Sequence, residues 1–229
     1  ALDHAWTTMT QGRPGPVQLD VPFNVFQESA DVEVPTAAGK RISRRSAASP
    51  EDVSGAVDML LAAECPVLFI GHGVTLSEAS AELTALAEKL SIPVISSPNG
   101  MGCLNMTHDL SLGFIGRNGV YPANQAGRHA DLVLAIGARF DDRSSSSWLP
   151  GYSWNFPHAK LIHVDVDPAE IGRNYAPDLG IVADARTVLR QLLGEIERRG
   201  ESGAPRLAVW RDEIATWQQE WHDFTTPNM

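Results

Sequence analysis

The sequence is poor in cysteine and in positive charge, and it has no long apolar run. Its two cysteines, Cys65 and Cys103, show no CxxC spacing, so we expect neither a disulfide scaffold nor a zinc site. No apolar run approaches the ~20 residues that span a bilayer, and the first residues resemble neither a signal peptide nor a transit peptide. We therefore expect a cytoplasmic protein with no membrane partner.

Acidic residues outnumber basic ones. Lysine and arginine number 18 against 28 aspartates and glutamates, which gives a formal net charge of -10. A surface of this sign does not attract a phosphate backbone, so nucleic acid is not an expected partner. Hydrophobic residues make up 43% and charged residues 20%, as in globular proteins. The 229 residues suit one large domain or two small ones.

The first 48 residues differ in pattern from the remainder. A helix that ends near Gln11 leads into a turn at residues 12–16 (GRPGP) and an alternating, strand-like segment at residues 17–21. This strand has no partner before a polar stretch rich in serine and arginine. We therefore expect residues 1–26 to be the tail of a preceding domain and residues 27–48 to be a linker.

Strands and helices alternate over residues 49–199. Ser49 is suited to cap a helix, Pro50 suits its first position, and apolar residues then recur at helical spacing. Continuous apolar runs, typical of parallel strands buried on both faces, occupy residues 66–70, 92–96, 131–136, 160–164 and 181–182. The pattern predicts an α/β fold: a Rossmann-like open parallel sheet of about six strands with helices on both faces.

Residues 200–229 form a third pattern. After a break at residues 200–205, large apolar side chains recur at steps of four, three, four and three, namely Trp210, Ile214, Trp217, Trp221 and Phe224. They predict a helix with one apolar face, which is covered either by its own domain or by a partner segment. The sequence leaves both alternatives open.

Ligands of open α/β sheets bind beyond the carboxyl ends of the strands, so the residues after each apolar run are candidate site residues. Residues 71–76 (GHGVTL) match the first half of the GxGxxG motif, with Leu76 in place of its third glycine. An ordinary strand-to-helix turn would use the same residues.

Two further strand ends carry charged residues. Residues 137–143 (GARFDDR) gather arginines that could grip a diphosphate and aspartates that could fix them, although a self-satisfied surface ion network has the same composition. Asp165 and Asp167 lie where a ribose hydroxyl would be held. Capping of a short helix at Pro168 requires the same residue type.

Three motifs give the chain a resemblance to thiamine diphosphate enzymes. Residues 12–22 (GRPGPVQLDVP) look like the close of their pyrimidine-binding domain. Residues 137–143 and 163–174 (HVDVDPAEIGRN) resemble their central domain, most closely that of acetolactate synthase and its relatives. The resemblance implies that residues 49–199 are the central domain of a longer carboligase or lyase acting on 2-oxo acids such as pyruvate.

The resemblance also implies what lies outside this chain. Residues 1–26 would end the pyrimidine-binding domain, and residues 200–229 would lead to a diphosphate-binding domain, in a full-length homodimer or homotetramer. Those flanking domains supply the activating glutamate and the Gly-Asp-Gly motif that binds Mg²⁺, and no such motif occurs here. We therefore expect thiamine diphosphate and Mg²⁺ to bind outside this chain, with no catalytic residue and no metal site within it, and the fragment alone to be inactive.

In acetolactate synthase the central domain binds FAD, mostly without redox use. Carried over one position at a time, the resemblance implies cofactor contacts at Gly71, Gly73, Ser97, Gly116, Gly137, Ala138, Arg139, Asp141, Arg143, Asp165, Val166 and Asp184. Departures concentrate where the flavin ring would lie: residues 97–99 are SPN in place of Thr-Leu-Met, and residues 116–118 are GRN in place of Gly-Met-His. Residues 144–157 also differ from the usual stretch. FAD, ADP, another nucleotide or none are therefore alternatives.

A second hypothesis is a self-contained nucleotide-binding module or NAD-dependent enzyme on a similar sheet. Composition alone would allow both hypotheses equally. The ends of the chain favour the first, because a self-contained protein has no reason to finish on an orphan tryptophan-rich helix.

Overall fold

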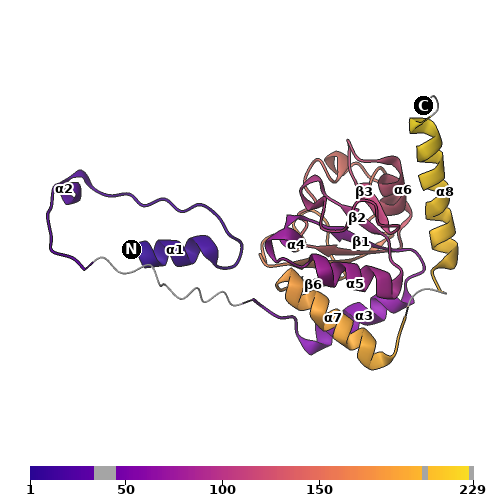
Figure 1. Ribbon diagram of the computed structural model, residues 1–229, viewed down its shortest axis with the longest axis horizontal. Helices are drawn as coiled ribbons and strands as arrows, with labels where there is room; N and C mark the ends of the chain where they lie inside the picture. Colours follow the sequence, from indigo (N-terminus) through magenta and orange to yellow (C-terminus); the bar gives the residue numbers. More distant parts are fainter. Residues whose placement is uncertain (34–44, 203–205, 227–229) are drawn as a thin grey trace. The chain divides into compact units, whose positions relative to one another are not determined.

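The computed structural model describes residues 1–33, 45–202 and 206–226, which form two units, Ala1–Arg45 and Ser46–Met229 (Figure 1). The elements in chain order are α1 (Leu2–Thr10), α2 (Phe23–Phe26), α3 (Pro50–Ala62), β1 (Pro66–Ile70), α4 (His72–Leu76), α5 (Ser80–Leu90), β2 (Val94–Ser96), η1 (Pro98–Gly100), β3 (Ser111–Phe114), α6 (Tyr121–His129), β4 (Leu132–Ile136), η2 (Ser146–Trp148), β5 (Lys160–Asp165), β6 (Leu179–Val182), α7 (Ala185–Arg199) and α8 (Ala208–Thr225).

The first unit has two helices and no buried residue among those described. The predicted helix end and turn are confirmed, since α1 stops before Gln11 and Gly12 has a φ of 60°. The strand predicted at residues 17–21 is wrong: among the described residues no segment pairs with it, and a strand needs a neighbour for its backbone N–H and C=O groups. Most of the predicted linker, residues 34–44, lies outside the described residues, so its boundaries stay a prediction.

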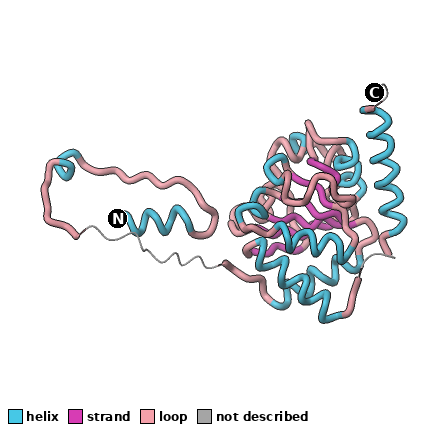
Figure 2. The backbone as a smooth tube through the Cα atoms, in the orientation of Figure 1, coloured by secondary structure: helices cyan, strands magenta, loops and turns pink. Residues whose placement is uncertain are grey.

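The second unit contains a six-stranded sheet in the order β3-β2-β1-β4-β5-β6. Every neighbouring pair is parallel, and the strands form a central layer with helices around it (Figure 2). The predicted Rossmann-like open parallel sheet is therefore confirmed. Strand order reverses at its centre, where β1 lies beside β4.

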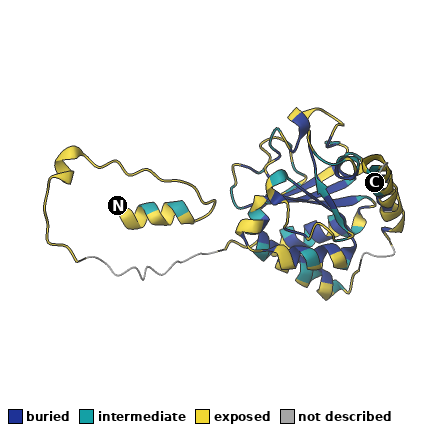
Figure 3. Ribbon diagram, turned by 45° about the horizontal axis from the view of Figure 1, so that its top comes forward, coloured by how far each residue is buried: buried dark blue, intermediate teal, exposed yellow. Residues whose placement is uncertain are grey.

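Alternate residues of each central strand enter opposite layers of the core. In β1, Leu68 and Ile70 belong to a cluster with α3, α5 and α7, whereas Val67 and Phe69 belong to a cluster with α6 and α8. Both faces are buried, which is why the strands read as continuous apolar runs. Figure 3 shows the buried strands between helices whose outer surfaces are exposed, so helices cover both faces as predicted.

Periodicity did not reveal β3, α4 or α6. The SLGF sequence of β3 is short and only partly buried, as an edge strand is. Helix α6 buries small residues rather than large ones, and a Cβ on its Gly127 would lie 2.4 Å from the Ile115 Cδ1 atom. Because α6 packs closely through small residues, its sequence lacks the periodic large apolar residues that would have predicted a helix.

The tryptophan-rich helix packs on its own unit through its first half. In α8, Trp210, Ile214 and Trp217 are buried, and the Trp210 indole N–H donates to the Pro66 carbonyl at 3.1 Å. The stripe emerges towards the end of the helix, where Phe224 is 75% exposed. Of the helices that the structure describes, none has the length and apolarity that crossing a membrane would require.

Candidate functional site

The predicted site residues gather along one edge of the sheet, because parallel strands present their carboxyl ends together. Gly71 and Gly73 follow β1, Ser97 follows β2, and Gly116 follows β3. The residues from Gly137 to Arg143 follow β4, Asp165 ends β5 with Val166 after it, and Asp184 follows β6. The motifs predicted neighbouring positions along one edge, and the structure brings these residues together there. Which side chains remain available to a ligand differs from one strand end to the next.

The turns after β1 and β4 are in direct contact at the centre of this edge. The Gly73 N–H donates to the Gly137 carbonyl at 3.2 Å, and a Cβ on Gly71 would lie 2.1 Å from that same oxygen. Gly137 has a φ of 56°, a conformation that disfavours other residues. Glycine is thus required here for the two turns to pack, and any ligand would lie over them rather than between them.

Two further turns join this centre. The Ser97 N–H donates to the Ile70 carbonyl at 2.8 Å, which ties the turn after β2 to the end of β1. After β3, the Asn124 amide holds both sides of Gly116, accepting from its N–H at 3.1 Å and donating to its carbonyl at 3.0 Å. A Cβ on Gly116 would lie 1.9 Å from the Arg143 carbonyl oxygen, so this glycine brings the β3 and β4 turns together.

The aspartates after β4 have partners other than the arginines of their own loop. Asp141 accepts from the Ser144 N–H and Oγ at 2.8 and 2.9 Å. Asp142 pairs with the Arg117 guanidinium and accepts from the Ser147 Oγ at 2.8 Å. The expectation that these carboxylates fix Arg139 or Arg143 is wrong, because Asp141 is bonded within its own turn and Asp142 to Arg117 and Ser147.

Arg139 and Arg143 are exposed, and neither guanidinium group has a hydrogen bond or ion pair with a residue in the described part of the chain. Both follow β4 within a few residues of Gly137. Unpaired guanidinium groups can donate paired hydrogen bonds to phosphate oxygens. Ala138, between Gly137 and Arg139, is buried.

Asp165 is 7% exposed, and burial raises the pKa of its carboxyl group. Its Oδ1 accepts from the Asp167 N–H at 2.9 Å, and the Asp167 Oδ1 accepts from the Ala169 N–H at the same distance. The carboxylates thus cap the turn after β5, in line with the capping interpretation of this motif, but the short helix expected at Pro168 is a turn.

Asp184 is likewise part of the fold. It caps α7, accepting from the Thr187 N–H at 3.1 Å, and its other oxygen accepts from the Ser77 hydroxyl at 2.6 Å. The Ser77 Oγ in turn accepts from the Arg186 N–H at 3.0 Å. The side chain of Asp184 therefore links α7 to the turn between α4 and α5.

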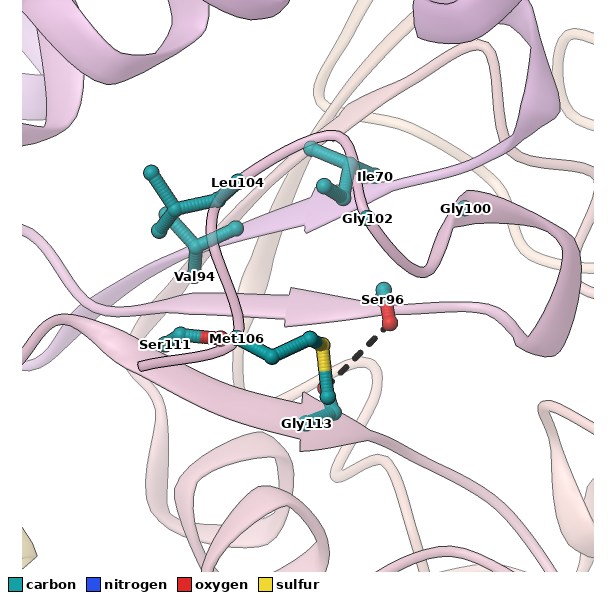
Figure 4. Close-up of a pocket in the computed structure, with 9 residues that line it drawn as sticks. All are labelled: Ile70, Val94, Ser96, Gly100, Gly102, Leu104, Met106, Ser111 and Gly113. Carbon is teal, nitrogen blue, oxygen red and sulfur yellow. Dashed lines mark hydrogen bonds between the residues drawn. The ribbon is translucent and has the colours of Figure 1, made fainter. Parts of the chain in front are cut away.

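A small hollow of about 10 Å³ lies among the ends of β1, β2 and β3 (Figure 4). Ile70, Ser96, Gly113 and Met106 are among its lining residues, and the Ser96 hydroxyl donates to the Gly113 carbonyl at 3.3 Å. A space of this size holds about one water molecule. The hollow is therefore too small to enclose a flavin ring system. The described residues also contain no cluster of His, Cys, Asp or Glu that could hold a metal ion.

Sequence reasoning assigned no role to three side chains that contact the Ala138–Phe140 segment. The His163 imidazole, the Asn174 amide and the Trp148 indole all bind its carbonyl groups. His163 and Asn174 stand at the two ends of the 163–174 motif, so the motif contained a signal for them. Trp148 lies in the stretch that departs from the family pattern, and no motif marked it.

Comparison with known proteins gives consistent results. Residues 53–192 match the family described as thiamine pyrophosphate enzyme, central domain. A probable acetolactate synthase large subunit from Methanocaldococcus jannaschii is 39% identical over 196 residues, covering 84% of this chain and 32% of that protein. The acetolactate synthase isozyme 1 large subunit of Escherichia coli is 37% identical over 220 residues, covering 96% and 37%.

The acetolactate synthase large subunit of Haemophilus influenzae is 34% identical over 222 residues, covering 95% of this chain and 38% of that protein. The chain thus spans about a third of the length of the curated relatives it matches.

Proposed function

The chain belongs to the family of thiamine pyrophosphate enzyme central domains, and from this premise we propose that it holds a nucleotide within a larger carboligase or lyase acting on 2-oxo acids. The relatives named as acetolactate synthases support pyruvate as a substrate of the whole protein. Within that protein, the present chain would stabilise the catalytic domains and bind an adenine nucleotide at the carboxyl edge of its sheet.

The observation that carries this proposal is the setting of Arg139. Its unpaired, exposed guanidinium follows β4 at the place where strand order reverses, which is where dinucleotides bind in sheets of this order. Arg143 offers a second such group four residues on. The exposed cations and the glycine turns after β1 and β4 fit a nucleotide diphosphate, so Gly71, Gly73, Gly137, Arg139 and Arg143 are the residues we expect to hold it.

The structure supports the ADP portion of FAD better than the flavin ring. The hollow beside β2 is small, and the turns near it carry the residues that depart from the family pattern. FAD, when bound, would stabilise this domain rather than take part in redox chemistry. ADP and FAD therefore both stay candidates, with the diphosphate as their shared recognition element.

Thiamine diphosphate would bind outside this chain, as would the Mg²⁺ that accompanies it. The described residues offer no metal cluster, and the family's Gly-Asp-Gly motif does not occur in the sequence. We further propose that flanking pyrimidine- and diphosphate-binding domains complete the active site in a cytoplasmic homodimer or homotetramer. This chain alone would then lack catalytic residues.

The experiment is to purify the whole protein that carries this chain, record its absorption spectrum and identify the nucleotide released on denaturation. An adenine nucleotide at about one per chain, together with acetolactate formation from pyruvate, thiamine diphosphate and Mg²⁺, is the expected result. The 229-residue chain should show no such turnover. Acetolactate formation by this chain alone would contradict the proposal that the catalytic residues lie in the flanking domains.

The alternative of a self-contained NAD-dependent enzyme is not favoured. The family match covers residues 53–192, and no relative named above is a dehydrogenase. In addition, Asp165, the carboxylate that would bind an NAD ribose, is buried and occupied by its own turn.

A further inference from the structure

Three successive carbonyl groups after β4 are each held by a side chain from elsewhere in the fold. The Ala138 oxygen lies 2.9 Å from the His163 Nε2 atom, and the Arg139 oxygen accepts from the Asn174 amide at 3.3 Å. The Phe140 oxygen accepts from the same amide at 3.1 Å and from the Trp148 indole N–H at 3.0 Å. We call His163, Asn174 and Trp148 the carbonyl clamp.

The clamp surrounds a strained residue. Phe140 has a φ of 50°, a conformation that bulky side chains rarely adopt and that costs free energy. Its ring is buried and packs against Phe69 and Trp154 at centroid distances of 5.0 and 5.4 Å. Because Phe140 turns inward and Ala138 is also buried, Arg139 is the exposed residue between two buried ones.

The His163 contact also fixes a charge state. A carbonyl oxygen can only accept, so Nε2 carries the proton, and burial lowers the pKa of the imidazole. The ring is therefore a neutral donor beneath the turn. It contributes no positive charge that would compete with Arg139 for an anion.

We propose that the carbonyl clamp consists of positioning residues, which hold the turn so that the Arg139 guanidinium stays exposed and available to the diphosphate of a bound nucleotide. This inference rests on the proposed function, since it assigns the clamp a role in the same site. It differs from a purely structural role in one respect: the effect of the clamp on nucleotide binding passes through Arg139.

The experiment removes donors without large changes of shape and measures ADP binding to the 229-residue chain. The variants are Asn174→Ala, Trp148→Phe and Arg139→Ala, alone and with each clamp variant combined with Arg139→Ala. Trp221→Phe on α8 is the matched control for Trp148→Phe. Backbone amide NMR titrations with ADP give dissociation constants into the millimolar range, and the Trp148 indole signal reports directly on the clamp.

Arg139→Ala should weaken ADP binding roughly tenfold or more, as loss of a charge-assisted hydrogen bond does. Asn174→Ala and Trp148→Phe should each weaken it about threefold to tenfold when Arg139 is present and less than about twofold when it is absent, because coupled residues are not additive. Trp221→Phe should leave the affinity unchanged. Thermal unfolding of every variant verifies that it is folded.

The outcomes separate this inference from the proposed function. If ADP binds and Arg139→Ala weakens it, but the clamp variants have no effect or an equal effect without Arg139, the positioning role is wrong and the nucleotide site stands. If the wild-type chain does not bind ADP, or Arg139→Ala binds it equally well, the nucleotide site itself is wrong and the positioning role fails with it.

Discussion

The two halves of the sheet's carboxyl edge use charged residues in opposite ways. At the central strand ends, after β1 and β4, Arg139 and Arg143 are exposed and have no partner among the described residues. At the lateral strand ends, after β5 and β6, Asp165 and Asp184 accept from backbone N–H groups of their own turns. A charged residue at a strand end is therefore a ligand candidate only when the fold leaves it unpaired.

The largest expected effect comes from Gly71→Ala at the central strand ends. The new Cβ would lie 2.1 Å from the Gly137 carbonyl oxygen, and backbone cannot move aside as a flexible side chain can. We expect the free energy of unfolding to fall by about 3 kcal/mol. Urea denaturation followed by circular dichroism measures it.

Gly194→Ala is the matched control for that variant. Gly194 lies inside α7, and a Cβ added there meets nothing within 4 Å. Alanine should stabilise the helix by up to about 1 kcal/mol. If both glycine variants had the same effect, the close contact between the β1 and β4 turns would not be what requires Gly71.

Arg139→Ala should change binding rather than stability. Removing a charge-assisted donor should weaken nucleotide binding by roughly 1.5 to 3 kcal/mol. The free energy of unfolding should change by less than about 0.5 kcal/mol, because the side chain is exposed and outside the core. Calorimetric titration of the whole protein with ADP and FAD measures the first quantity. Unchanged affinity with a sharply lower melting temperature would make Arg139 a structural residue.

Asp184→Ala should show the reverse behaviour at the lateral strand ends. It removes the cap of α7 and the acceptor of the Ser77 hydroxyl, so the free energy of unfolding should fall by about 1 kcal/mol. Nucleotide affinity should stay within twofold of the wild-type value, because sites that share no contacts have nearly independent effects. A large loss of affinity with normal stability would show that Asp184 contacts the ligand.

Asp165→Asn should have a small effect that depends on pH. Burial raises the pKa of this carboxyl group, so the folded state prefers its neutral form. The free energy of unfolding of the wild type is therefore highest below the unfolded pKa of Asp165 and falls as the pH rises through the folded pKa. Asparagine keeps an oxygen that can accept from the Asp167 N–H. The variant should therefore gain stability relative to wild type from pH 4 towards pH 8, as measured by urea denaturation at each pH. A difference that does not vary with pH would contradict this account.

The fold could be predicted from the sequence wherever burial is continuous. The strands β1 and β4 are buried on both faces, so each appears in the sequence as a continuous apolar run that predicts a strand. Residues 17–21 have the alternation of a strand, but no segment in the described part of the chain pairs with them, and no sequence pattern reports whether a partner is present. Helix α6 was missed because it packs closely on the sheet through small residues.

The positions of the candidate site residues along the sheet could be predicted from the sequence, but their contacts could not. Strand ends fix the edge, and so Gly71, Gly137 and Arg139 lie where the motifs placed them. The pairing of Asp142 with Arg117 joins segments far apart in sequence, which spacing within one motif does not reveal. The same limit applies to the carbonyl clamp, where Asn174 reaches a turn about 35 residues earlier.

We propose that a nucleotide diphosphate binds at the central strand ends and not at the lateral ones. The most direct measurement is an amide NMR titration of the 229-residue chain with ADP, mapping the shifts along the carboxyl edge. The account predicts saturable shifts at residues 71–73 and 137–143, with little change at residues 165–167 and 183–187. Shifts concentrated at the lateral strand ends, or none at millimolar ADP, would contradict it.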